Sequence, residues 1–308
     1  MSTLRREAVR VVVPATSANL GPGFDSAGLA LSVFDEYVAM VTEDDGVLVE
    51  VVGEGDDSIP LDESHLVVRS MRAAFAWLGI DQPGFILRCT NNIPHGRGLG
   101  SSAAAIVGGM VLARAMVDDG PERMSDSDLL QAALVEEDHP DNLAAALHGG
   151  FTVAWLEDDG FGDCVRMDVH PQVQPVVLVP PNEVPTQKAR AMLPASVSFA
   201  DAALNLSRAA LLVHAVTTDP SRLMAATEDR LHQHAREEAY PSSLALLSEL
   251  RNEGVPAVIS GAGPTVLAFV DDQTRPIVAR IGARGAWLMS EVGVAAAGAR
   301  EVPIPPLD

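Results

Sequence analysis

A glycine turn in front of a long apolar helix is the feature that most constrains the fold of this chain. The stretch IPHGRGLGSSAAAIVGGMVLARAMV runs from residue 93 to 117 and follows a strand-like segment at residues 85–90. The pattern predicts a helix over residues 101–117, and because it is apolar on nearly every side, this helix should lie in a core. A strand, a turn and a helix N-terminus place unpaired backbone N–H groups and the positive end of a helix dipole at one spot. Such a spot can bind a phosphate group.

Two familiar phosphate-binding motifs do not account for this turn. The G-x-x-x-x-G-K-[ST] loop requires a lysine, and the only lysine, Lys188, lies far away in VPTQKAR. The G-x-G-x-x-G dinucleotide motif would place its third glycine at position 101, which is Ser101. A plain strand-to-helix turn with serine N-caps and no ligand is the simpler alternative, and the turn alone does not decide between the two.

Charge and composition exclude several classes of function. The chain has 308 residues, is 47% hydrophobic and carries a formal net charge of -21. It is therefore long enough for two globular domains. Its negative charge opposes binding to nucleic acid or to an anionic membrane surface, because both need clustered Lys and Arg. An anionic small molecule remains possible if backbone N–H groups, a metal or a few arginines concentrate positive charge locally.

The cysteines and the amino terminus carry no sign of secretion. Cys89 and Cys164 are too few for a disulfide framework and lack a zinc-site spacing. No apolar segment follows the first charged residues, and no run of 18 uninterrupted apolar residues occurs. We therefore expect a cytoplasmic protein with no membrane partner.

Strand-like and helix-like segments alternate along the chain, which predicts an α+β fold. Pro14 should end the first strand, so a long irregular loop is expected from Ala15. The clearest break, at residues 158–163, divides the chain into domains 1–158 and 159–308. The expected strands cover residues 9–13, 29–42, 47–52, 85–90, 151–156, 165–169, 176–179, 257–260, 266–270 and 286–289. The expected helices cover residues 65–78, 101–117, 125–137, 200–217, 220–235 and 274–284.

Five blocks, in order from residue 14 to 266, resemble the motifs of the GHMP small-molecule kinases. They are PATSANLGPGFDSAGLAL, the P-x-x-x-G-L-G-S-S-A-A stretch of residues 94–104, EDHPDN, TQKAR and SGAGPTV. The first and fourth separate homoserine kinases from their relatives, and EDHPDN resembles the homoserine kinase block E-G-H-P-D-N. Two departures stand out: Asp138 replaces a glycine of the E-G-H-P-D-N block, and His65 stands where relatives often have an asparagine near the adenine.

The resemblance implies a fold and a reaction. The fold would be a two-domain α+β GHMP kinase fold, with a nucleotide-binding domain that contains a left-handed βαβ unit and a ferredoxin-like C-terminal domain. The reaction would be ATP- and Mg²⁺-dependent phosphorylation of the L-homoserine hydroxyl to O-phospho-L-homoserine, a step toward threonine. The active site would lie between the domains, commonly in a homodimer.

The resemblance also assigns the nucleotide and the metal to particular residues. Ser102 and Glu137 match the metal positions, and a hydroxyl with a carboxylate suits Mg²⁺. Without the resemblance, Glu137 would be read as a solvated charge at a helix end. The nucleotide-binding positions are Pro94, His95, Gly96, Arg97, Gly98, Leu99, Gly100, Ser101, Ser102, Ala103, Ala104, Gly261 and Gly263.

The substrate positions follow in the same way. An amino acid needs a pocket of both signs, with arginine for its carboxylate and acidic or amide groups for its ammonium. Asp25, Thr186 and Arg190 are the expected catalytic residues, with Asp25 orienting the hydroxyl and Thr186 on the same helical face as Arg190. The expected substrate-binding residues are Asn19, Asp25, Asp141, Asn142, Arg190 and Arg236. Arg236 could instead lie on the surface of a helix. Asn19 and Asp25 could instead serve only to form a turn in a loop of glycine and proline.

Two other functions stay open at this point. Another kinase of the same group could act on an alcohol such as mevalonate, although an apolar substrate would not explain Arg190 beside Asn19, Asp25 and Asp141. A non-catalytic metabolite-binding member would keep the fold without needing the phosphate turn and the metal pair.

Overall fold

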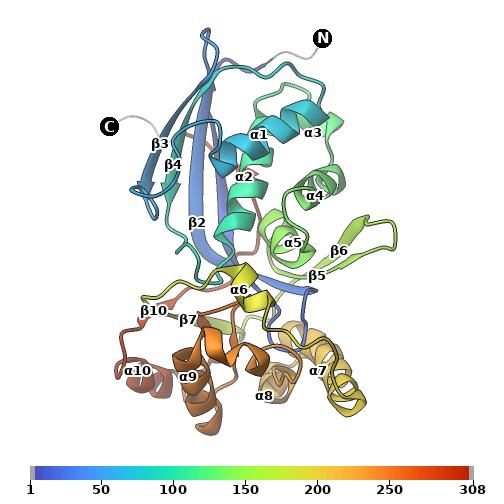
Figure 1. The fold of residues 1–308 in the computed structure, drawn as a ribbon, viewed down its shortest axis with the longest axis vertical. Coiled ribbons are helices and arrows are strands. Elements are labelled where there is room, and N and C mark those ends of the chain that lie inside the picture. Colours follow the sequence, from blue (N-terminus) through green and yellow to red (C-terminus); the bar gives the residue numbers. More distant parts are fainter. Residues whose placement is uncertain (1–3, 305–308) are drawn as a thin grey trace.

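The computed structural model describes residues 4–304 and has two halves, each built around one β-sheet (Figure 1). The first sheet has seven strands in the order β11-β1-β2-β4-β3, with β5 paired to β2 and β6 paired to β5. These strands are β1 (Val9–Ala18), β2 (Ala27–Val41), β3 (Val47–Gly53), β4 (Phe85–Asn91), β5 (Phe151–Leu156), β6 (Gly162–Met167) and β11 (Arg300–Glu301). The helices of this half are α1 (Leu66–Trp77), α2 (Ser101–Ala115), α3 (Gly120–Arg123), α4 (Asp126–Leu134) and α5 (Pro140–His148).

The first strand runs straight through the proline that was expected to end it. β1 extends to Ala18, and its register against β2 shifts between Pro14 and Ala15. Because Pro lacks an N–H group, it is tolerated at such an irregularity in the ladder. The prediction of an irregular loop from Ala15 is therefore wrong, and the loop begins only at Asn19.

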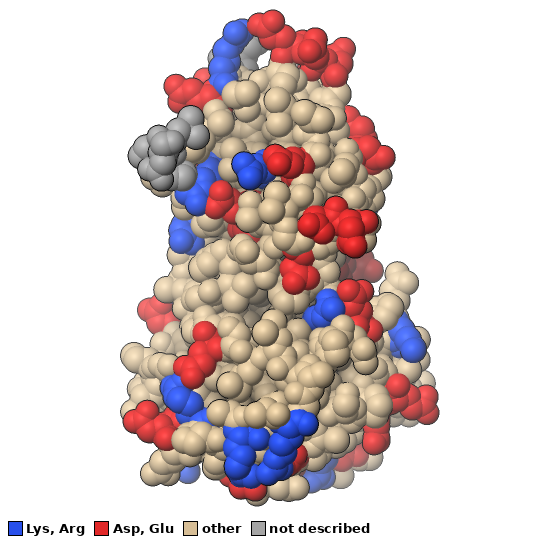
Figure 2. Space-filling view, turned by 90° about the vertical axis from the view of Figure 1, so that its left-hand side faces the viewer, with Lys and Arg blue, Asp and Glu red and all other residues tan. Residues whose placement is uncertain are grey.

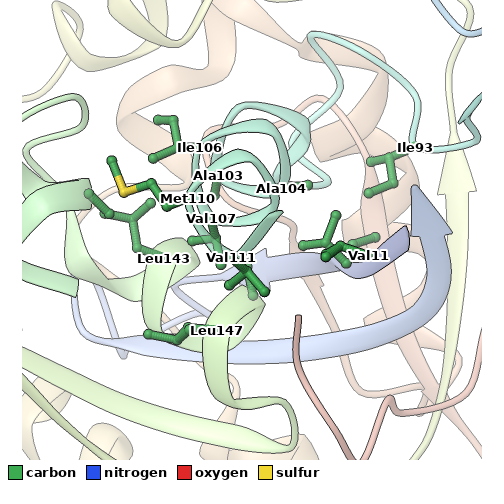
Figure 3. Packing of buried hydrophobic residues seen from close by; sticks show 14 of the residues in the cluster. Val11, Ile93, Ala103, Ala104, Ile106, Val107, Met110, Val111, Leu143 and Leu147 are labelled. Atoms are coloured by element: carbon green, nitrogen blue, oxygen red, sulfur yellow. The ribbon is translucent and has the colours of Figure 1, made fainter. Parts of the chain in front are cut away.

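The expected helix after the glycine turn lies in the core of the first half. In Figure 3, Ala103, Val107 and Val111 of α2 belong to the same packed cluster as Val11 of β1 and Leu143 of α5. All five side chains are buried. This burial confirms the prediction drawn from a helix that is apolar on nearly every side, and it fixes the N-terminus of α2 relative to the sheet.

A βαβ unit lies at the edge of the first sheet. β3 and β4 pair in parallel, and α1 connects them and packs against α2. His65 begins α1 as its N-cap: its side chain accepts the Val67 N–H. The expected left-handedness of this crossover stays a prediction.

The second half has the strand order of a ferredoxin-like domain, as expected. Its antiparallel sheet runs β10-β7-β9-β8. Helices lie between β7 and β8 and between β9 and β10, which gives the β-α-β-β-α-β arrangement. The elements are β7 (Gln174–Val179), α6 (Thr186–Arg190), α7 (Phe199–Thr217), η1 (Pro220–Arg222), α8 (Leu223–Ala226), η2 (His234–Ala239), α9 (Pro241–Asn252), β8 (Ala257–Ile259), β9 (Val266–Val270), α10 (Arg275–Gly282) and β10 (Leu288–Glu291).

The two halves exchange chain segments. The predicted division at residue 158 falls in the turn of the β5–β6 hairpin, and β11 returns to pair with β1 in the first sheet. The loop between β8 and β9 also contacts the first half, since the Gly261 N–H donates to the Ala18 carbonyl at 3.0 Å. Where the domains divide stays a prediction.

Several helices differ from the sequence prediction. The single helix expected over residues 220–235 is broken into η1, α8 and the start of η2, because the Asp229 carboxylate accepts the backbone N–H groups that a helix would use. Helices α5 and α9 were not predicted. Both begin with a proline in the first turn, a position where the missing N–H group costs nothing.

One helix within residues 4–304, α7, has the length and hydropathy of a membrane span. A single such helix is weak evidence, because helices of soluble folds pass the same test. α7 contacts both halves: Asn205 donates to the Pro22 carbonyl of the first half at 3.2 Å, and Arg208 pairs with Glu228 of the second half at 3.0 Å.

Candidate active site

The glycine turn brings the N-terminus of α2 to the junction of the two halves. Gly96, Gly98 and Gly100 have φ angles of 62°, 75° and 72°, which disfavour any residue with a Cβ. Gly100 is the N-cap of α2, and no side chain caps this helix. The alternative in which serines cap the helix is therefore wrong, since Ser101 and Ser102 are its first residues. The N–H groups of the first turn stay available to a ligand.

The turn is closed on one side by the glycine-rich loop between β8 and β9. Ser260 Oγ donates to the Gly98 carbonyl at 2.6 Å, and a Cβ on Gly98 would lie 2.3 Å from the Ser260 carbonyl oxygen. On the other side, a Cβ on Gly100 would lie 1.9 Å from Thr16 Oγ1. Both glycines are thus fixed by close approach of the surrounding chain.

A cavity of about 140 Å³ opens in front of this turn. It brings together predicted residues that are distant in sequence and that come from both halves of the molecule. Its lining consists of Asn19, Gly96, Gly98, Gly100, Ser101, Ser102, Ala103, Glu137, His139, Asp141, Asn142, Thr186, Arg190, Arg236, Gly261 and Ala262. His139 and Ala262 are additions to the predicted set.

Some residues of the predicted nucleotide motif lie outside this lining. Leu99 and Ala104 are buried in the core. Arg97 turns away and donates to the carbonyls of Pro180 and Pro181. Pro94 and Gly263 complete the two turns, and His95 lines a neighbouring cavity. These residues shape the site, and any direct contact of theirs with a nucleotide stays a prediction.

The neighbouring cavity has a volume of about 350 Å³ and shares Gly96, Ser101 and Ser102 with the first. Sequence reasoning missed most of its lining. The residues are Asp35, Tyr37, Ile59, Pro60, Ser64, His65, Leu66, Val67, Asn91, His95, Gly96, Ser101, Ser102 and Ala105. Apart from His65 and the motif residues His95, Gly96, Ser101 and Ser102, they come from strands, a loop and helices that no shared motif marks.

Two buried polar groups line this second cavity. Asp35 accepts the backbone N–H groups of Asn92 and Ile93 at 2.7 and 2.9 Å, and burial raises its pKa to about 6. His65 Nδ1 accepts the Val67 N–H at 3.2 Å, while its Nε2 is buried without a hydrogen-bond partner. Burial also lowers the pKa of His65. Its Nε2 is therefore a donor that a ligand could satisfy.

The loop after β1 carries the first pair of expected substrate residues. Asn19 and Asp25 have positive φ angles of 69° and 54°, and Asn19 Oδ1 accepts the Asp25 N–H at 2.9 Å. Asn19 Nδ2 donates to the Gly261 carbonyl at 2.9 Å. Asn19 therefore stabilises a turn, which was its alternative role. The same turn places the Asp25 carboxylate beside Arg190.

Arg190 and Thr186 lie on the short helix α6, as the TQKAR spacing predicted. Arg190 forms a two-pronged ion pair with Asp25, at 2.8 and 3.3 Å. Both Thr186 and Arg190 line the cavity, which confirms that they share a helical face.

Arg236 is buried, contrary to the alternative of a surface helix position. Its residue exposure is 1%, and burial lowers its pKa. The guanidinium groups of Arg236 and Arg190 lie 5.5 and 5.9 Å from the ring centre of Phe24. Within residues 4–304, no carboxylate lies within 4.0 Å of the Arg236 guanidinium nitrogens. A buried cation without a carboxylate is costly unless a ligand supplies the anion.

Acidic and amide groups face these arginines. Asp141 is 2% exposed and lies in the first turn of α5, where its Oδ1 accepts the Asn142 N–H at 2.7 Å. Burial raises the pKa of Asp141 to about 6. Asn142 Oδ1 accepts a hydrogen bond from Thr16 Oγ1 at 2.7 Å. The cavity therefore has the two signs that an amino acid requires.

Glu137 and Ser102, the expected metal positions, both line the cavity. Glu137 Oε1 lies 2.8 Å from His139 Nδ1, and this hydrogen bond raises the pKa of His139. In the described part of the chain, no three His, Cys, Asp or Glu side chains are grouped as a metal site. One hydroxyl and one carboxylate suit a magnesium ion that takes its other ligands from phosphate and water.

The acidic charge of the chain is not concentrated at one place. Figure 2 shows Asp and Glu over both halves of one face, with Lys and Arg in small groups between them. Many of the basic groups are paired: ion pairs join Arg72 to Glu63, Arg208 to Glu228 and Arg284 to Glu249. No extended basic surface for a polyanion appears on the face shown.

Comparison with known proteins agrees with this geometry. Family models described as GHMP kinases N terminal domain and GHMP kinases C terminal match residues 65–150 and 210–284. The chain belongs to the GHMP kinase family. A curated relative from Streptomyces avermitilis is named homoserine kinase and is 50% identical over 300 residues, which cover 97% of each chain.

Two further relatives carry the same name. The homoserine kinase of Mycobacterium tuberculosis is 46% identical over 290 residues, which cover 92% of this chain and 91% of that protein. The crystal structure of a homoserine kinase from Cytophaga hutchinsonii has a TM-score of 0.83 and 25% identity, and the match covers 98% of this chain and 99% of that one.

Proposed function

We propose that this chain catalyses the ATP-dependent phosphorylation of the L-homoserine hydroxyl, which yields ADP and O-phospho-L-homoserine, a precursor of threonine. The observation that carries the proposal is the junction cavity, where an uncapped helix N-terminus faces Arg190 and the buried Arg236. The relatives that cover nearly the whole chain are named homoserine kinases, which supports the same substrate.

The triphosphate of ATP would bind at the glycine turn. The backbone N–H groups at the start of α2 and the positive end of its dipole favour a polyanion there. Gly98 and Gly100 allow this turn to form, because a Cβ at either position would clash with Ser260 or Thr16. The nucleobase would then enter the neighbouring cavity, where His65 Nε2 offers an unused donor.

Ser102 and Glu137 would hold Mg²⁺ beside the phosphates. Bound there, Mg²⁺ would neutralise charge on the phosphate oxygens during transfer. Glu137 provides the protein carboxylate and Ser102 provides a hydroxyl at the first turn of α2, so the site needs few protein ligands. His139 donates to Glu137 and would fix the orientation of that carboxylate.

The substrate would bind between the two arginines and the acidic groups. Arg190 and Arg236 suit the carboxylate of an amino acid, and Asp141 with Asn142 and Asn19 suits its ammonium group. This arrangement leaves the hydroxyl end free to point toward the glycine turn. Thr186, on the same helix face as Arg190, would donate a hydrogen bond from its hydroxyl to the phosphate or to the substrate.

Asp25 would orient the attacking hydroxyl. The hydroxyl oxygen forms a bond to the γ-phosphorus as the bond from that phosphorus to the oxygen of ADP breaks, and the hydroxyl proton passes to the transferred phosphoryl group or to water. Because the transition state of phosphoryl transfer is loose, it demands little of a base. Asp25 is held by two contacts to Arg190, which suits a positioning role.

The direct test measures ADP release with ATP and Mg²⁺ over L-homoserine, L-threonine, L-serine, mevalonate and galactose. We expect L-homoserine to have the highest kcat/KM. Equal rates over the panel would contradict the substrate, and a preference for mevalonate would favour another kinase of the family. Binding of nucleotide without turnover of any alcohol would favour a non-catalytic member.

We also propose that the enzyme is a homodimer in the cytoplasm. Phe199 and Leu206 of α7 are 90% and 73% exposed, and such apolar side chains suit an interface between copies. Light scattering of the purified chain checks the oligomeric state, with a monomer at micromolar concentration as the contrary result.

A further inference from the structure

The segment between α8 and η2 is built around buried polar groups that the proposed reaction has not used. Asp229 is 6% exposed, and its carboxylate accepts the backbone N–H groups of Leu231, His232 and Gln233 at 3.0, 3.1 and 2.9 Å. Gln233 Oε1 in turn accepts the Ile259 N–H of β8 at 2.6 Å. The backbone on both sides of His232 is therefore fixed to the second half of the molecule.

The two ring nitrogens of His232 have partners of opposite character. Nε2 lies 2.8 Å from the Gly21 carbonyl oxygen, which can only accept, so Nε2 carries the proton and donates. Nδ1 lies 3.2 Å from Arg236 Nη1, which can only donate, so Nδ1 is unprotonated and accepts. These two contacts select one neutral tautomer of the imidazole.

His232 thereby joins two parts of the candidate active site. Gly21 belongs to the loop that carries Asn19 and Asp25, and Arg236 comes from the second half of the molecule. The His232 ring also lies 5.0 Å from the Phe24 ring, which itself contacts the guanidinium groups of both arginines. A shift of His232 would move these groups together.

A neutral acceptor suits Arg236 better than a carboxylate would. A carboxylate within hydrogen-bond distance would orient the guanidinium but would also neutralise it, which would weaken its attraction for a ligand anion. An imidazole nitrogen orients the guanidinium and leaves its positive charge available. This difference gives a physical reason for a histidine at this position.

We propose that His232 is a positioning residue whose Nδ1 holds Arg236 against the anionic group of the substrate, while the contact of Nε2 with the Gly21 carbonyl sets the tautomer. The inference rests on the proposed function, because it takes Arg236 as part of the substrate pocket. His232 itself lines no part of that pocket and is not a catalytic residue.

The role of His232 gives the enzyme a pH dependence. A proton on Nδ1 would remove the acceptor and place a second cation beside Arg236. The charged groups that act on His232 are Asp229, whose Oδ2 lies 3.8 Å from Nε2, together with Arg236 and Asp25. Burial is the main cause that lowers the pKa of His232, so the imidazole stays neutral down to pH values below the usual histidine range. The KM for the alcohol substrate should rise only as the pH falls below that range.

Two substitutions separate the two contacts of His232. His232→Asn places an amide oxygen near the position of Nδ1 and can still accept from Arg236. His232→Gln places its amide nitrogen near Nε2 and keeps the donor to Gly21. We expect His232→Gln to raise the KM for the alcohol about tenfold or more at unchanged KM for ATP, since it loses a hydrogen bond to a charged group. His232→Asn should stay within about threefold of wild type and should lose the rise of KM at acid pH.

The contrary outcomes are distinct. If both variants raise KM equally, or if His232→Gln leaves KM unchanged, the positioning role is wrong. The assay uses whichever alcohol of the panel the wild type phosphorylates, so failure of L-homoserine as substrate overturns the proposed function and not this inference. The ¹⁵N chemical shifts of the His232 ring add a readout that needs no turnover: a proton on Nδ1 at neutral pH would overturn the inference.

Discussion

Asp25 and Arg190 form an ion pair across the candidate active site, with contacts of 2.8 and 3.3 Å between the loop after β1 and helix α6. Asp25 belongs to the first half of the molecule and Arg190 to the second, so this pair joins the two halves at the cavity. An anionic substrate group that approaches Arg190 meets a guanidinium that is already oriented.

Arg190→Ala should weaken use of the amino-acid substrate more than it weakens use of ATP. Loss of charged hydrogen bonds worth roughly 3 kcal/mol lowers kcat/KM for L-homoserine by about 100-fold. Steady-state kinetics with each substrate varied in turn checks this. Arg208→Ala is the matched control, because Arg208 forms a similar half-exposed ion pair, with Glu228, away from the cavity. Equal losses in both variants would contradict the role of Arg190.

Gly100→Ala should destabilise the fold and weaken ATP binding. Gly100 and Gly254 both have positive φ angles, of 72° and 82°, so an alanine costs about 1 kcal/mol of backbone strain at either site. A Cβ on Gly100 would also meet Thr16 Oγ1 at 1.9 Å, whereas a Cβ on Gly254 has nothing within 4 Å. The free energy of unfolding in urea should therefore fall by about 2 kcal/mol more in Gly100→Ala than in Gly254→Ala. Similar free energies of unfolding for the two variants would show that the turn tolerates a side chain.

Glu137→Gln should mainly affect metal-dependent turnover. The amide keeps the size of the side chain but loses the charge that Mg²⁺ prefers, so kcat should fall about 100-fold and the Mg²⁺ concentration for half-maximal rate should rise. Glu136→Gln is the control, because Glu136 pairs with Arg69 and is absent from the cavity lining. A Glu137→Gln enzyme with the wild-type response to Mg²⁺ would remove Glu137 from the metal site.

Asp141 should make stability depend on pH between about 4 and 6. Its pKa is raised by burial to about 6 in the folded chain and is near 3.8 when unfolded. Between these two pH values the folded state holds a proton on Asp141 that the unfolded state has released. The contribution of this proton to stability is complete below pH 4 and is lost as the pH rises through 6. The free energy of unfolding of Asp141→Asn, taken relative to wild type, should therefore be higher at pH 7.5 than at pH 4 by on the order of 2 kcal/mol. Urea unfolding at both pH values checks this, and a difference that does not change with pH would contradict it.

The fold was predictable where the pattern was local and strong. The apolar run of α2 and the strand before it each give a signal within a few residues, and the structure confirms them. The path of β1 through Pro14 was not predictable, because it depends on a register shift against β2. Residues 229–235 were predicted as the end of a helix over residues 220–235, yet the Asp229 carboxylate accepts their backbone N–H groups.

The candidate site was predictable only in part. Motif spacing identified Arg190 and Thr186 correctly as neighbours on one helix face. The burial of Arg236 and its contact with Phe24 arise from packing between segments that are distant in sequence, which no local pattern encodes. Asp35 also reaches the second cavity through tertiary contacts alone, whereas the family resemblance had already set His65 near the adenine.

The most direct measurement is a crystal structure with a nonhydrolysable ATP analogue and L-homoserine. We expect phosphates on the backbone N–H groups at Ser101 and Ser102, and the homoserine carboxylate on Arg190 or Arg236 with its hydroxyl toward Asp25. A nucleotide bound elsewhere while the start of α2 stays free of phosphate, or homoserine absent from the arginines, would contradict the account.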